Sequence, residues 1–399
     1  MIRVANVQAL GYFGGPQHRA VQVAERLFEH DIHTTVILPR EGSDETVERL
    51  VAAGVPVLRL PMHRLTRQKS HLAGFALMFG PELALLVAAL LRERADIVHC
   101  NGAWQVKSVL AGRLAGKRVA LHVNDTFTTP AMSLLYRMVA PLCDGYIFSG
   151  ERAKAAHPAA AGRADAVIET IPAPVDTARF DPSITEPDAG LAAAPGQHVI
   201  TVGMVNPAKG LEHFVALAAA IRRVRSDATF HVIGGQLDSQ RQYFADVKRQ
   251  AGDLLSGALT FRGPSTDMPA VYRAADIYVC SSVAEASPMA VWEAMSMALP
   301  IVSTDVGDVA RYVEEGRSGF IVPVGDVSAL ADRVTRLLDD PERRRAMGEH
   351  ARRTAVERLD LSRCVALHRS FYHALLESRR PVGGRTAGRN RAADAVRPA

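Results

Sequence analysis

Residues 277–295 read IYVCSSVAEASPMAVWEAM. The first four residues, 277–280, form an apolar run that is typical of a buried strand. Pro288 suits the first turn of a helix, because its missing N–H would have no helical partner there. The stretch therefore predicts a strand, a loop and a helix starting at Pro288. Glu285 then lies in the loop, and Glu293 lies about one and a half turns inside the helix.

The start of this helix combines two kinds of binding group. Free amides at Met289, Ala290 and Val291, together with the positive end of the helix dipole, suit a phosphate. The carboxylates of Glu285 and Glu293 accept hydrogen bonds from neutral hydroxyls. A ligand with sugar hydroxyls at both ends and phosphates in the middle is a sugar nucleotide. Two glutamates near a helix start also often do no more than complement the dipole, so a structural role stays open.

The same succession of strand and helix repeats along the whole chain. Strand-like runs are predicted at 2–7, 34–38, 55–59, 96–100, 119–122 and 145–148, and again at 199–202, 229–233, 259–262, 277–280, 300–303 and 320–322. Helical patterns lie between several of them, at 17–29, 81–94, 104–114 and 131–142. This alternation predicts an α/β protein with two doubly wound, Rossmann-like domains that face a central cleft, where ligands bind beyond the strand ends.

The pattern breaks at residues 172–176, PAPVD, which suggests a linker. We expect an N-terminal domain over 1–175 and a C-terminal domain over 176–361. A last helix is predicted at about 362–378 from apolar residues at helical spacing. The remaining residues, 379–399, have no apolar period and are predicted to form a disordered basic tail.

Composition and charge exclude some classes of function. The chain has 399 residues and a net charge of +5, and the tail alone holds six arginines and one acidic residue. The part that is expected to fold is therefore near neutral, which argues against a nucleic-acid partner. Four scattered cysteines favour a reducing compartment. The start, MIRVANVQAL, shows no signal peptide, so we expect a cytoplasmic protein.

Three further positions are candidates for contact with a ligand. Gly14 and Gly15 follow the first strand and would let backbone approach a phosphate, although a tight structural turn explains them equally well. Lys209 is expected to open a helix, where a lysine opposes the dipole; binding a diphosphate would explain it, and a solvated lysine is the alternative. His122 is expected at the end of a strand in the cleft, where it could contact substrate. A histidine whose hydrogen bonds are all made to neighbouring residues is the more usual outcome.

Taken together, these residues resemble the GT-B glycosyltransferases, specifically the retaining family 4 type, also called glycosyl transferases group 1. The resemblance covers the chain to about Ser378. It rests chiefly on Glu285, Glu293 and Lys209-Gly210. Supporting features occur in the family's order, namely Gly14-Gly15, the linker before Phe180, and Gly307.

The resemblance implies roles on the donor side. Lys209 would bind the donor diphosphate and stabilise charge on the departing phosphate. Glu285 would bind hydroxyls of the donor sugar, and Glu293 those of the ribose. The remaining positions would shape the donor site or face it across the cleft: Gly14, Gly15, His122 and the amides of Met289, Ala290 and Val291.

It also implies partners and architecture. The donor would be a UDP- or GDP-sugar, bound by the C-terminal domain without any metal or other cofactor. The N-terminal domain would bind a glycan, lipid-linked or small-molecule acceptor, in polysaccharide, cell-envelope or glycolipid synthesis. The anomeric configuration would be retained, and the helix at 362–378 would cross back to the N-terminal domain.

One departure from the family pattern keeps alternatives open. Met204 stands where the family usually has an arginine that pairs with the lysine, and Arg262 is a candidate substitute. A non-catalytic, glycosyltransferase-like binding protein is therefore one alternative. A sugar-nucleotide epimerase of related fold is another, whereas the missing Gly-x-Gly-x-x-Gly pattern argues against a dinucleotide oxidoreductase.

Membrane association is a separate expectation. Residues 62–71 are basic and adjoin the apolar residues 72–79. Basic and apolar residues acting together would hold the acceptor domain against anionic lipid, as a peripheral protein at the inner face of the plasma membrane. A solvated loop before a buried helix is the alternative.

Overall fold

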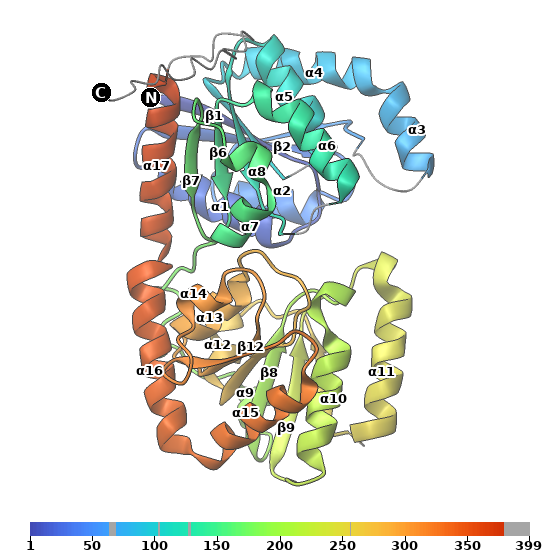
Figure 1. Cartoon of the computed structure of the whole chain (residues 1–399), viewed down its shortest axis with the longest axis vertical. Helices are drawn as coiled ribbons and strands as arrows, with labels where there is room; N and C mark the ends of the chain where they lie inside the picture. Colours follow the sequence, from blue (N-terminus) through green and yellow to red (C-terminus); the bar gives the residue numbers. More distant parts are fainter. Residues whose placement is uncertain (64–68, 103, 127–128, 256, 379–399) are drawn as a thin grey trace, which may run out of the picture.

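The computed structural model describes residues 1–378, apart from 64–68, 103, 127–128 and 256. Two parallel sheets lie one above the other, each covered by helices (Figure 1). The upper sheet has the strand order β3-β2-β1-β4-β5-β6-β7, and the lower sheet has the order β10-β9-β8-β11-β12-β13. The prediction of two doubly wound α/β domains is confirmed.

The strands agree with the predicted runs to within a few residues, with one addition. The upper sheet consists of β1 (Ile2–Gln8), β2 (Ile32–Pro39), β3 (Val57–Leu60), β4 (Ile97–Asn101), β5 (Arg118–Val123), β6 (Gly145–Phe148) and β7 (Val167–Thr170). The lower sheet consists of β8 (Gln197–Val202), β9 (Ala228–Ile233), β10 (Leu259–Gly263), β11 (Ile277–Cys280), β12 (Ile301–Thr304) and β13 (Gly319–Val322). The sequence missed β7, because this half-buried edge strand is not a continuous apolar run.

The helices lie between the strands. Those of the first half are α1 (Gly15–Phe28), α2 (Asp44–Ala52), α3 (Lys69–Leu77), α4 (Phe79–Arg92), α5 (Val106–Leu114), α6 (Pro130–Val139), α7 (Glu151–Ala156) and α8 (Pro158–Ala161). Those of the second half are α9 (Ala189–Ala192), α10 (Leu211–Arg222), α11 (Arg241–Leu255), α12 (Met268–Arg273), α13 (Met289–Ser296), α14 (Val309–Tyr312), α15 (Val327–Asp339), α16 (Pro341–Arg358) and α17 (Leu361–Glu377). Helix α4 begins at Phe79 rather than at Pro81, which occupies the first turn, where no hydrogen bond is lost.

The last helix returns to the first half of the molecule. Figure 1 shows α17 beside β7, and it packs against both α1 and β7. Its buried residues Phe371, Tyr372 and Leu375 belong to a core that α17 shares with α1 and the strands of the upper sheet. Val175 pairs with Asp360, so the two crossings between the halves run side by side. The predicted crossing of the C-terminal helix is confirmed.

In each sheet there is a point where the order in which the strands are added reverses. In the upper sheet this point lies between the neighbouring strands β1 and β4, and in the lower sheet between β8 and β11. Crevices for ligands form outside the carboxyl ends of the strands at such points. A Cβ added to Gly15, which follows β1, would lie 3.8 Å from Sδ of Met289, which follows β11. The two crevices therefore face each other.

A second contact between the halves is a helix cap. The carboxylate of Asp308, which is buried, accepts hydrogen bonds from the backbone N–H groups of Glu151 (2.7 Å) and Arg152 (3.0 Å) at the start of α7. Arg152 also pairs with Asp305 at 2.5 Å. A Cβ on Gly150 would lie 2.7 Å from Cγ of Asp308, so glycine is needed for this approach.

Two sequence expectations fall wholly or partly outside the described residues. The basic tail at 379–399 lies outside them, and so does the middle of the basic segment 62–71. Across the described ranges, none of the helices has both the length and the apolarity required to cross a bilayer.

Candidate functional site

The loops that follow β8 and β11 are joined to each other. The N–H of Val283 donates to the carbonyl of Ala208 (2.8 Å), and the hydroxyl of Ser281 donates to the carbonyl of Lys209 (3.1 Å). Gly210 has a φ of 57°, and a Cβ there would lie 2.3 Å from the carbonyl oxygen of Ser281. Glycine is therefore required for the approach that brings Lys209 to the second loop.

Lys209 and Glu285 form a partly buried ion pair. Nζ of Lys209 lies 2.6 Å from Oε1 of Glu285, which also accepts a hydrogen bond from the hydroxyl of Ser282 at 2.9 Å. Burial works to lower the pKa of Lys209, but the Glu285 carboxylate outweighs it, so the pKa is raised and the ammonium form is retained. Lys209 ends a short 3₁₀ turn, 207–209, and Gly210 caps α10, which corrects the expectation that Lys209 opens a helix.

Glu293 lies deeper in the same site. Its side chain is buried on α13, and Oε2 accepts a hydrogen bond of 2.9 Å from the hydroxyl of Tyr272. Burial raises the pKa of Glu293 to about 7, against the opposing effect of the Tyr272 hydroxyl. A ligand that donates hydrogen bonds to this carboxylate would favour its charged form.

The start of α13 differs slightly from the prediction. Pro288 is the N-cap rather than the first helical residue, and the N–H of Val291 already donates to its carbonyl at 3.0 Å. The amides of Met289 and Ala290 remain as the first-turn groups that point out of the helix. Gly14 caps α1 across the cleft, so the positive ends of two helices approach each other near Met289.

Arg179 is a cation of this region that the sequence did not single out. It lies in the segment between the sheets, with its guanidinium 5.4 Å from the ring centre of Phe180. Its charge acts on both halves. In the lower half, burial raises the pKa of Glu293, and the Tyr272 hydrogen bond and then the charge of Arg179 oppose that rise. In the upper half, burial and then the charge of Arg179 lower the pKa of His18 to about 4. The only available signal was its place in the linker motif before Phe180.

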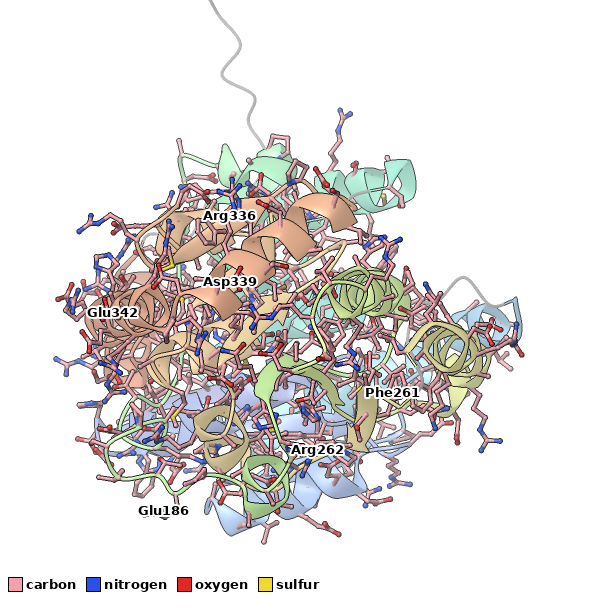
Figure 2. The ribbon with its side chains drawn as sticks, turned by 90° about the horizontal axis from the view of Figure 1, so that it is seen from below. Glu186, Phe261, Arg262, Arg336, Asp339 and Glu342 are labelled. Carbon is pink, nitrogen blue, oxygen red and sulfur yellow. The ribbon has the colours of Figure 1, made fainter. Side chains whose placement is uncertain are left out.

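Arg262 does not take the place of the missing arginine. Its guanidinium donates to the carboxylate of Asp188 at 2.8 Å, at the N-cap of α9. Its charge also acts on His198, at the start of β8, whereas the site lies beyond the other end of that strand. Figure 2 labels Arg262 beside Phe261 in the view from the lower end of the molecule. The suggestion that Arg262 compensates for Met204 is therefore wrong.

His122 lies behind the wall of the cleft. Its side chain is 1% exposed, Nδ1 lies 3.1 Å from Nε2 of His99, and Nε2 lies 3.2 Å from the hydroxyl oxygen of Ser149. His99 in turn lies 2.7 Å from the hydroxyl of Tyr372 on α17. Burial lowers the pKa of His122 well below its usual value, so the ring is neutral. The expectation that His122 contacts substrate directly is not met by this geometry.

The residue that reaches the cleft from this strand end is Asn124. Its carboxamide oxygen accepts a hydrogen bond from the hydroxyl of Ser149 (2.5 Å), and its amide donates to Oδ1 of Asn101 (2.6 Å). A row of hydrogen-bonded side chains thus runs from α17 through His122 to the cleft. His122 is a positioning residue for Asn124, because it acts only through Ser149.

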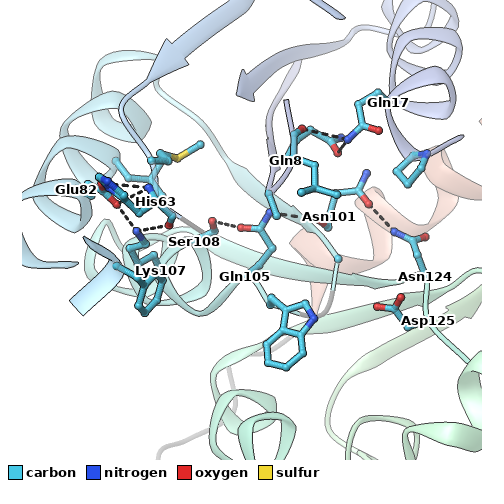
Figure 3. Close-up of a pocket in the computed structure, with 18 residues that line it drawn as sticks. Gln8, Gln17, His63, Glu82, Asn101, Gln105, Lys107, Ser108, Asn124 and Asp125 are labelled. Atoms are coloured by element: carbon cyan, nitrogen blue, oxygen red, sulfur yellow. Dashed lines mark hydrogen bonds and ion pairs between the residues drawn. The ribbon is translucent and has the colours of Figure 1, made fainter. Parts of the chain in front are cut away.

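A cavity of 440 Å³ opens at the carboxyl ends of β1 and β4 (Figure 3). This size falls within the usual range for small-molecule sites. At one end the buried carboxylate of Glu82 is paired with Lys107 and His63. The cavity is also lined by Ser108, Trp104 and Asp125. Its remaining polar lining residues carry carboxamides: Gln8, Gln17, Asn101, Gln105 and Asn124.

The cavity adjoins the donor side of the cleft. The hydroxyl of Thr126, next to Asp125, donates to the backbone carbonyl of Glu285 at 2.9 Å. A molecule in the cavity would therefore lie beside the Lys209–Glu285 pair. The described residues contain no group of three or more histidine, cysteine or acidic side chains arranged to hold a metal ion.

Comparison with known families agrees with this geometry. Residues 13–179 match the family model described as Glycosyltransferase Family 4, and residues 196–340 match the model described as Glycosyl transferases group 1. The chain belongs to this family of GT-B glycosyltransferases and is a glycosyltransferase. The alternatives of a non-catalytic binding protein and an epimerase are not supported.

Curated relatives span most of the chain. The 2-deoxystreptamine glucosyltransferase of Streptomyces kanamyceticus is 29% identical over 76% of this chain and 83% of its own. The alpha-maltose-1-phosphate synthase of Mycolicibacterium smegmatis is 28% identical over 87% of this chain and 91% of its own. The HepE protein of Anabaena, solved with UDP, has a TM-score of 0.78 at 19% identity over 94% of this chain and all of its own. This last likeness supports the fold.

Proposed function

We propose that the protein transfers a sugar from a nucleoside diphosphate sugar, with UDP favoured over GDP, to an acceptor held by the upper half, with retention of the anomeric configuration. The observation that carries the proposal is the Lys209–Glu285 pair, set beside the opposed ends of α1 and α13. Structural neighbours solved with UDP and UDP-glucose support the donor class.

The donor would lie across the start of α13. Its diphosphate would take the amides of Met289 and Ala290 and the ammonium of Lys209, while the ribose hydroxyls donate to Glu293. The phosphate would replace Glu285 as the partner of Lys209. The freed Glu285 carboxylate would then accept hydrogen bonds from the transferred sugar.

The chain's own positive groups make a metal unnecessary in this proposal. Lys209, Arg179 and the ends of two helices would stabilise the charge that develops on the departing diphosphate. Arg179 would supply the charge that Met204 lacks. Turnover is therefore expected to continue in excess EDTA.

Retention follows from where the acceptor would lie. The cavity adjoins Glu285 through Thr126, and in the proposed donor pose the leaving phosphate would lie on the same side. An acceptor hydroxyl arriving there would attack the oxocarbenium-like carbon from the face that the nucleotide leaves.

The test is UDP release from UDP-sugars in EDTA, with the product anomer read by NMR. We expect an axial product from an axial donor, and loss of turnover with unchanged folding in Lys209→Ala. An inverted product would reject retention. No turnover and no UDP binding would instead favour a non-catalytic relative.

We also propose that the upper half rests on anionic membrane. Leu77, at the end of α3, is 80% exposed, and α4 exposes Leu85 and Leu91. These residues follow the basic segment 62–71 in the sequence, and basic and apolar residues that act together favour anionic lipid. Co-sedimentation with phosphatidylglycerol vesicles, but not with phosphatidylcholine vesicles, is expected at low salt. Equal recovery in the supernatant with both would reject the idea.

A further inference from the structure

The charges of the acceptor-side cavity are not evenly distributed. Figure 3 shows the cluster of His63, Glu82 and Lys107 at one end and Asn124 with Asp125 at the other. Three groups in the cluster contact the carboxylate of Glu82. The backbone nitrogen of His63 lies 3.0 Å from Oε2 of Glu82, and Nδ1 of the His63 ring lies 2.5 Å from Oε1. The ammonium of Lys107 forms an ion pair with the same carboxylate. Glu82 and Lys107 therefore neutralise each other.

Asp125, at the other end, has no such partner. Among the residues that the structure describes, it takes part in no hydrogen bond and no ion pair. One ring that acts on Asp125 electrostatically is His157, which donates from Nδ1 to the carbonyl of Ala153 (2.8 Å) and whose Nε2 is buried without a hydrogen-bond partner among the described residues. Among the described residues, His157 is therefore bonded to its own helix and forms no ion pair or hydrogen bond with the Asp125 carboxyl group.

Most carboxamides of the cavity are engaged in hydrogen bonds within the protein. The amide of Gln105 donates to the carbonyls of Val7 and Asn101, and its oxygen accepts from Ser108. The amides of Gln8 and Gln17 also donate within the protein. Asp125 is thus a lining carboxyl group without a hydrogen-bond or ion-pair partner among the described residues, and it stands next to Thr126, which touches the donor side. Burial raises the pKa of Asp125, and a cationic partner would favour its charged form.

A phosphate in this cavity would meet Asp125 without finding a free cation among the described lining residues. An ammonium group would find a desolvated carboxylate that lacks a partner. Trp104 is one of the lining residues, and an indole ring suits the C–H face of a saturated ring. We propose that the acceptor is a small polyhydroxylated ring compound that carries an amino group near the reacting hydroxyl and carries no phosphate. This inference rests on the proposed transferase function.

The experiment offers three matched panels of acceptors with a UDP-sugar: amino sugars and aminocyclitols, their hydroxyl counterparts, and the phosphate monoesters of those counterparts. UDP release above hydrolysis is measured for the native protein and for Asp125→Asn, with Asp253→Asn on the exposed surface of α11 as the control for net charge. UDP affinity, measured separately, reports whether the donor site is intact.

We expect the highest kcat/KM with an amino compound. Asp125→Asn should lower it at least tenfold more than it lowers kcat/KM for the hydroxyl counterpart, while Asp253→Asn changes neither. A preferred phosphate monoester, a preferred hydroxyl counterpart, or equal losses for the matched pair would overturn the inference. UDP binding without turnover in any panel would overturn it too, whereas absence of UDP binding would reject the proposed function itself.

Discussion

The two sides of the cleft are built in different ways. The lower side places its charged groups in or beside the first turns of helices, using two segments that are each short in sequence, 203–210 and 281–293. The upper side draws neutral carboxamides from several elements and engages them in hydrogen bonds within the protein, pairs Glu82 with Lys107, and leaves Asp125 without a partner among the described residues. Charges at helix ends leave local patterns in a sequence, whereas a neutral recognition surface is assembled only by the fold.

The largest effect should come from breaking the charged side at its centre. Lys209→Met removes the ammonium but keeps the length of the side chain, and it leaves Glu285 unpaired. Loss of one group that stabilises transition-state charge typically costs about 10²- to 10³-fold, and we expect kcat/KM to fall by that much. Steady-state UDP release measures it. A loss below about fivefold would show that the helix ends suffice without the lysine.

The second prediction compares two arginines of the lower side. Arg179→Ala should weaken UDP binding about tenfold, or about 1.4 kcal/mol, because its charge reaches Glu293 and the start of α1. Arg262→Ala should leave UDP affinity unchanged, because that arginine is engaged by Asp188. Calorimetric titration distinguishes them. The reverse order would return the role of the missing arginine to Arg262.

The third prediction uses the titration of Glu293. Its folded pKa of about 7 lies above its ordinary value of 4.5, so the stability that its neutral form provides is present below pH 4.5 and is lost as the pH rises through 7. At pH 8 the ionised group costs up to about 3 kcal/mol. Glu293→Gln should therefore be more stable than the native protein at pH 8, with a difference that shrinks toward pH 5.

The binding of UDP should show the opposite dependence. Ribose hydroxyls donate to the carboxylate, so native affinity should rise through about pH 7, and that rise should be absent in Glu293→Gln. Glu186→Gln, on the exposed surface, is the control for both measurements. A Glu293→Gln protein with native UDP affinity across this range would remove Glu293 from the donor site.

The lower side of the site could be predicted from the sequence because its residues form short local motifs. A proline, two glutamates and a lysine–glycine pair predicted loops and a helix end that the structure brings together, with Lys209 against Glu285. The errors there were of one or two residues, at Pro288 and at the start of α10, because caps are decided by backbone geometry.

Most residues of the upper side of the site could not be predicted from the sequence. His122 was selected at a strand end, but its ring is buried between His99 and Ser149, and Asn124, just past the end of β5, lines the cavity instead. Nothing local distinguishes the carboxamides from surface residues. The ion pair of Glu82 with Lys107 joins α4 and α5 and depends on the packing of those helices.

The smallest effect tests the buried row that supports Asn124. Ser149→Ala removes the link between His122 and Asn124 and leaves the buried His122 nitrogen unpaired, which should cost about 1–3 kcal/mol of stability. The acceptor KM should rise by about two- to fivefold, with UDP affinity unchanged. Equal changes in acceptor KM and UDP affinity would show that the two sides are not separable. The control Ser226→Ala lies in the exposed segment before β9.

Lys209 is the group proposed to hold the donor diphosphate between the two halves. The decisive measurement is calorimetric titration of the native protein and of Lys209→Met with UDP and with UMP, in EDTA. We predict that the native protein binds UDP at least tenfold more tightly than UMP, and that Lys209→Met loses most of this difference. Equal affinities for UDP and UMP in the native protein would contradict the account.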